Sequence, residues 1–79
     1  MVGLERIHEL RKEIDEIDKQ IAELLEERVR VVTEIGKIKR ELGLPIRDEK
    51  REEELLKRAD RFKEVFEKIL EACRDVQRV

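Results

Sequence analysis

A chain of 79 residues is long enough for one domain, and no run in it approaches the ~20 apolar residues that cross a membrane. The 19 basic and 21 acidic residues nearly cancel, and the net charge of −2 argues against a nucleic-acid-binding protein. The single Cys excludes an internal disulfide, and no Cys and His cluster suggests a metal site. A domain this small, with two Phe and no Trp or Tyr, is expected to need a partner chain for stability.

Apolar residues at helical spacing predict one long helix over residues 4–42. They form two rows that alternate at intervals of three and four residues, which is typical of a coiled-coil-like seam. The first row is Ile7, Ile14, Ile21, Ile35 and Leu42, and the second is Leu10, Ile17, Leu24, Val31 and Ile38. At ~1.5 Å per residue the helix is roughly 58 Å long, far longer than a compact domain of this size is wide. A second copy of the chain is therefore its simplest partner.

Residues 43–47 are predicted to form a turn. Gly43 suits the position after a helix end, and Pro45 cannot easily continue a helix. Asp48 suits an N-cap or first-turn position, where its charge meets the positive helix end. A second helix is therefore predicted over about 48–59.

The remainder of the chain contains no Gly or Pro, so on pattern alone it could continue as one helix. We expect a break near Asp60, whose side chain could cap a third helix over about 61–78. The predicted fold class is all-α, with residues 1–79 forming a single three-helix domain.

Charged residues on and beside the seam are the first candidates for function. Arg28 occupies a seam position, where a polar residue either sets register or lines a cavity for an anion. Lys39 lies about three turns further on, so the two side chains face nearly the same way and could grip one small molecule. Arg11 precedes Arg28 by roughly 25 Å of helix, too far to reach the same ligand. Flank charges such as Arg11 and Lys39 are often only solvated, but if Arg11 serves a similar site, a second chain must complete it.

Further candidates lie at other seam positions. Gly36, one turn before Lys39, is either a tolerated helix Gly or makes room for a ligand or a packed helix. Asp48, Arg51 and Glu52 lie on one face of the second helix. They are either a solvated first turn or part of a site. Near the C-terminus, Cys73 lies on the seam, where a Cys is more often a core residue than a reactive thiol, and Gln77 follows one turn later.

Taken in order, these residues resemble the all-helical class of chorismate mutases. The resemblance is strong over residues 4–58 and weaker over 62–78, and it is carried by the segments 10–18, 24–28, 35–39, 45–48 and 51–52. The sequence departs from the family pattern at Cys73, where relatives often carry Ser. The stretch between Glu52 and Cys73 is also shorter than usual, so either the chain folds back near Asp60 or the partner supplies the third-helix groups.

The resemblance implies an intertwined homodimer with two equivalent sites, each completed by Arg11 of the other chain. It implies that Lys39 and Gln77 hydrogen-bond the ether oxygen of the breaking bond and that Glu52 contacts the ring hydroxyl. It implies further substrate-binding residues, which are Arg11, Arg28, Asp48, Arg51 and Cys73. The implied reaction is the rearrangement of chorismate to prephenate, without metal or cofactor.

Such a unimolecular rearrangement needs only side chains that hold a compact conformer and stabilise negative charge on the ether oxygen. Two alternatives are an isochorismate-pyruvate lyase on the same fold and a non-enzymatic helical dimerisation module. The module explains the seam but not the joint placement of Arg28, Lys39 and Glu52. We further expect a monofunctional, cytoplasmic protein that binds neither nucleic acid nor membrane.

Overall fold

The protein is described here from a computed structural model that covers residues 2–78. Its elements are α1 (Val2–Leu42), α2 (Glu49–Ala59), a 3-10 turn (Asp60–Phe62) and α3 (Lys63–Gln77). The all-α prediction is confirmed, since the described residues contain helices, turns and bends but no strand. No helix among them is long and apolar enough to cross a membrane.

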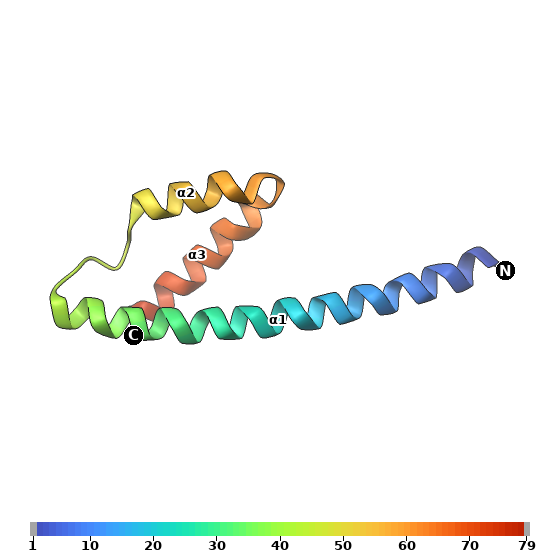
Figure 1. The fold of residues 1–79 in the computed structure, drawn as a ribbon, viewed down its shortest axis with the longest axis horizontal. Coiled ribbons are helices and arrows are strands. Elements are labelled where there is room, and N and C mark those ends of the chain that lie inside the picture. The colour runs from blue at the N-terminus through green and yellow to red at the C-terminus, as the bar shows by residue number, and fades with distance from the viewer. Residues whose placement is uncertain (1, 79) are drawn as a thin grey trace.

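The molecule has the shape of a long rod with a short helical hairpin on one half (Figure 1). Its principal extents are 62 × 23 × 14 Å, and α1 runs the full length of the long axis. The hairpin of α2 and α3 lies over the C-terminal half of α1, where α3 packs against α1 and α2 packs against α3. The N-terminal half of α1 extends beyond the hairpin, and every residue from 2 to 27 is exposed.

A Schellman motif ends α1 and sets the direction of the following loop. Gly43 adopts a φ of 70°, which costs a residue without Cβ little. The amide of Gly43 donates to the carbonyl of Arg40 at 3.3 Å, and that of Leu44 to the carbonyl of Lys39 at 2.8 Å. The loop then leads to Asp48, whose side chain caps α2 by accepting from the amide of Arg51 at 3.1 Å.

The reversal between α2 and α3 lies at Asp60–Phe62, but the expected role of Asp60 was wrong. Asp60 ends α2 with a φ of 52° and a ψ of −117°, a positive-φ conformation outside the left-handed helical region and uncommon for a residue with a Cβ. It does not cap the last helix, because α3 begins at Lys63 after the 3-10 turn and its N-cap, Phe62, makes no side-chain capping bond. Phe62 is also 56% exposed, although it belongs to the apolar seam of the sequence.

The tightest packing in the molecule lies where α3 crosses α1. Three residues are buried there, namely Gly36, Cys73 and Gln77. A Cβ built on Gly36 would lie 3.1 Å from Cγ of Gln77 and 3.3 Å from its Cα, so the absence of a side chain lets α3 approach. Arg40 adds a bond from Nη1 to the carbonyl of Gln77 at 3.0 Å, which fixes the end of α3 on α1.

Candidate active site

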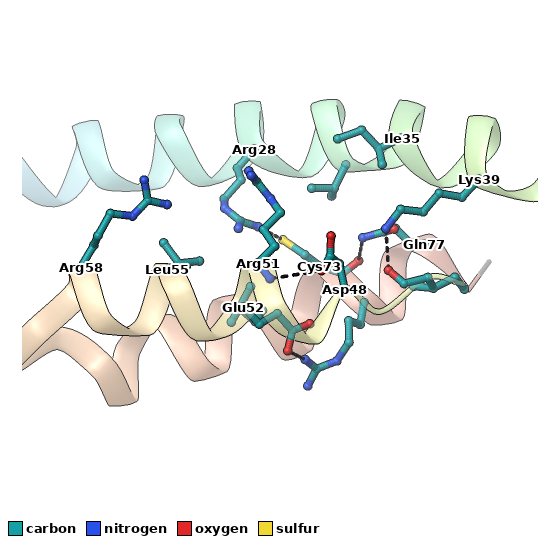
Figure 2. A pocket seen from close by; sticks show the side chains of 14 residues that line it. Arg28, Ile35, Lys39, Asp48, Arg51, Glu52, Leu55, Arg58, Cys73 and Gln77 are labelled. Atoms are coloured by element: carbon teal, nitrogen blue, oxygen red, sulfur yellow. Dashed lines mark hydrogen bonds and ion pairs between the residues drawn. The ribbon is translucent and has the colours of Figure 1, made fainter. Parts of the chain in front are cut away.

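A cavity of about 420 Å³ opens between the three helices, within the size range of small-molecule sites. Its wall combines apolar side chains with charged ones from every helix (Figure 2). Seven of the eight predicted site residues line it; these are Arg28, Lys39, Asp48, Arg51, Glu52, Cys73 and Gln77. Residues far apart in the sequence therefore meet at one cavity on the C-terminal half of the rod.

Arg28 reaches into the cavity from α1 and meets α3. Its Nη1 donates to Sγ of Cys73 at 2.8 Å, and the Cys73 side chain is buried at 4% exposure. Arg28 forms no ion pair with a carboxylate of residues 2–78, so its charge stays available. Of the two interpretations of a polar seam residue, the one in which Arg28 lines a cavity matches this position.

Lys39 lies three turns further along α1 and lines one end of the cavity, with Arg28 between it and Arg58 (Figure 2). Its Nζ donates to the carbonyl of Ile46 at 2.7 Å, in the loop whose direction the Schellman motif sets. An ammonium group carries three N–H donors, so one bond to the loop leaves others for a ligand. The loop therefore holds the cation in place without neutralising it.

Gln77 enters the cavity from α3, in the same chain as Arg28 and Lys39. Its Nε2 donates to the carbonyl of Cys73 at 3.4 Å, while its Oε1 is buried without a hydrogen-bond partner among the described residues. The second N–H of that amide remains a donor for a ligand. The chain folds back at Asp60, and this reversal brings Cys73 and Gln77 to the same cavity as Glu52. Of the two possibilities left open by the short stretch between Glu52 and Cys73, the structure therefore has the fold-back.

On α2, the first two turns face the cavity with both signs of charge. Arg51 and Asp48 are exposed at its mouth, whereas the Glu52 side chain is only 12% exposed. The Glu52 carboxylate accepts from Arg74 of α3 at 2.8 Å and from Arg47 at 3.2 Å. It is therefore fixed in the wall by two arginines from different parts of the chain.

Several cavity residues are absent from the sequence prediction. They are Val32, Ile35, Ile46, Leu55, Arg58, Leu70 and Arg74. Leu55 and Arg58 could have been found, because they lie four and seven residues after Arg51 and so continue its face of the helix. Arg74 could not, because its approach to Glu52 depends on how α3 folds back on α2.

Arg11 is the one predicted site residue that lies away from the cavity. It is exposed on the N-terminal half of α1, where no part of residues 2–78 packs against it. The cavity of a single chain thus lacks the residue that a second chain was expected to supply.

Comparison with known proteins agrees with this geometry. Residues 10–64 match the model of the family described as chorismate mutase type II. That stretch contains six of the seven charged cavity residues and the whole of α2, so the match includes much of the site. The chain belongs to the type II chorismate mutase family.

Two solved structures share the fold. A chorismate mutase (form II) from Thermus thermophilus is 40% identical, with a TM-score of 0.87 over 92% of this chain and 94% of that one. A conserved hypothetical protein from Pyrococcus furiosus is 63% identical, with a TM-score of 0.85 over 86% of this chain and 90% of that one. The long helix and its hairpin are therefore an arrangement that these two proteins also have.

Among curated proteins, a chorismate mutase from Methanocaldococcus jannaschii is 35% identical over 72 residues, or 91% of this chain. The chain spans 63% of that protein's length, and 23% and 17% of the lengths of two other curated relatives. Those relatives thus contain sequence that has no counterpart here, and their activities as whole proteins are not transferred.

Proposed function

We propose that this protein catalyses the rearrangement of chorismate to prephenate, without a cofactor, in the synthesis of phenylalanine and tyrosine. One observation carries the proposal: four cations face a cavity of about 420 Å³ from two helices and form no ion pair within residues 2–78. These are Arg28, Lys39, Arg51 and Arg58. Unpaired cations around one cavity suit a small dianion, and planar guanidinium forks suit its two carboxylates.

This reaction has two requirements that such a cavity can meet. The substrate must be held in a compact diaxial conformer, so that its conformational entropy is lost on binding and does not add to the activation barrier. Bond breaking runs ahead of bond making, so negative charge builds on the ether oxygen. Lys39 and Gln77 have free donors at the same end of the cavity, and a fixed donor there stabilises the transition state more than the ground state.

We further propose that the working unit is a homodimer in which each cavity receives Arg11 from the other chain. Two features support this. Arg11 lies outside its own chain's cavity, and ten large apolar side chains of the α1 seam are between 38% and 67% exposed. They are the two predicted rows, Ile7, Ile14, Ile21, Ile35 and Leu42 with Leu10, Ile17, Leu24, Val31 and Ile38.

A cytoplasmic location belongs to the same proposal. Cys73, the one Cys of the chain, is a free thiol in the cavity wall and accepts a hydrogen bond from Arg28. A reducing compartment keeps such a thiol in its reduced form.

Turnover of chorismate by the purified protein tests the activity directly. Loss of chorismate with formation of prephenate is the expected result, and release of pyruvate from isochorismate would instead identify the lyase. A bicyclic diacid that mimics the transition state should raise the melting temperature of the protein. A helical dimerisation module would do none of these.

Mixing two inactive variants tests the shared site. An Arg11→Ala chain and an Arg28→Ala chain should each be inactive alone, but their heterodimer has one cavity with both arginines. Random exchange of chains at equal amounts should restore about a quarter of the wild-type activity, since half the dimers are mixed and each has one intact site. A mixture that stays inactive after exchange has been verified would argue against a shared site.

A further inference from the structure

Glu52 is the more buried of the two carboxylates that line the cavity, and two arginines bind it. Arg74 donates from Nη1 to Oε1 of Glu52 at 2.8 Å, and Arg47 donates from Nε to the same oxygen at 3.2 Å. The Arg74 side chain is 22% exposed and that of Arg47 is 55% exposed. Arg74 is thus the closer and better shielded of the two partners, and screening by water weakens it less.

The other cations of the cavity contrast with Arg74. Four of them form no ion pair within residues 2–78, and they are Arg28, Lys39, Arg51 and Arg58. A carboxylate in the same cavity is the natural competitor for any of them, because opposite charges attract strongly where water is scarce. What keeps Glu52 away from these cations is its attachment to the wall formed by α3.

We infer that Arg74 is a positioning residue for the reaction, which acts by holding the Glu52 carboxylate on the cavity wall and so keeps the four free cations for the substrate. The inference rests on the proposed function, because it assigns the free cations to a dianion. Both arginine bonds converge on Oε1, so Oε2 of Glu52 is the atom left to accept the substrate hydroxyl.

Loss of the Arg74 charge has a defined consequence. Glu52 then keeps only Arg47, which is half-exposed and more distant. The freed carboxylate turns toward the cavity cations and competes with the substrate carboxylates for them. Such competition acts on the ground-state complex, so KM should rise more than kcat falls.

Four variants make the test: Arg74→Gln, Arg74→Lys, Glu52→Gln and the double variant Arg74→Gln with Glu52→Gln. For Arg74→Gln we expect KM for chorismate to rise about tenfold while kcat stays within about threefold of wild type. Arg74→Lys restores much of the loss, because it restores the charge without the planar fork. In the Glu52→Gln background the same change at Arg74 should matter little, because no carboxylate remains to be held.

A matched control and an independent readout separate this role from a structural one. Arg78→Gln removes the arginine that directly follows α3 and pairs with Asp75; both side chains are exposed, and the change should leave KM unchanged. A variant that merely folds poorly loses active protein and hence kcat, with KM preserved. Titration calorimetry with the bicyclic diacid should show the same loss of affinity as KM.

Two results would overturn the inference: an unchanged KM and diacid affinity in Arg74→Gln, or effects of the Arg74 and Glu52 changes that simply add. If the wild-type protein neither converts chorismate nor binds the diacid, the proposed function fails and this inference fails with it. That outcome differs from an active wild type whose two residues are uncoupled.

Discussion

The two halves of α1 have the same apolar pattern but very different surroundings. From Arg28 onward the helix packs against α3 and provides one wall of the cavity, whereas residues 2–27 are exposed along their whole length. The apolar seam nevertheless continues through both halves, with Arg28 as its one charged position. The C-terminal half is therefore partly covered by its own chain and the N-terminal half is not covered at all, while seam residues in both halves stay exposed. This difference is what the proposed homodimer explains, since Arg11 lies in the uncovered half.

The largest expected effect lies in the packed half, at Lys39. Lys39→Ala removes the cation proposed for the ether oxygen and should lower kcat on the order of a thousandfold. Helix content, melting temperature and dimerisation should not change, because the Lys39 side chain makes one hydrogen bond within residues 2–78, to a loop carbonyl. Lys37→Ala, an exposed neighbour outside the cavity, is the matched control, and steady-state kinetics with circular dichroism compare the two. Near-normal turnover in Lys39→Ala would refute its role.

The next effect lies in the exposed half, at Ile17. Ile17→Asp places an unpaired charge on the seam and should weaken dimerisation on the order of a hundredfold, because burying that charge is costly. Sedimentation over a range of concentrations would show the dissociation, with activity lost in parallel as Arg11 is withdrawn. Lys19→Asp places the same acidic side chain two residues further on and off the seam, with an even larger change of charge, so it should leave the dimer intact. A wild-type protein that is monomeric at all concentrations would contradict the assignment of the exposed half of α1 to a dimer interface.

The smallest effect tests the crossing of α3 over α1. Gly36→Ala places a Cβ 3.1 Å from Cγ of Gln77, so Gln77 must shift and kcat should fall about tenfold. Gly3→Ala is the control, because its Cβ would meet no atom within 4 Å. Gly36→Ala gains ~1 kcal/mol of helix propensity, so a loss of activity in it reports the contact with Gln77 and not a weaker helix. Equal kinetics for the two variants would show that the position of Gln77 is not critical.

Local residue chemistry accounts for most of what was predictable from the sequence. The end of α1 at Leu42, the turn after it and the start of α2 beside Asp48 follow from Gly43, Pro45 and the capping side chain. Helical period also placed Arg28 and Lys39 on nearly one face, which is how they come to line the same cavity. The boundary before α3 was less well predicted, since no Gly or Pro marks it and Asp60 turns the chain by its backbone rather than by capping.

The sequence by itself determined the helices and the charged residues on their faces, because period, caps and breakers act within a few residues along the chain. Only the tertiary structure decided that Gln77 packs on Gly36, that Cys73 meets Arg28 and that Arg74 holds Glu52. Each of these contacts joins segments more than 20 residues apart, and its geometry depends on the angle at which α3 returns after Asp60. A periodic pattern shows which face of a helix is apolar, but not which other helix covers it.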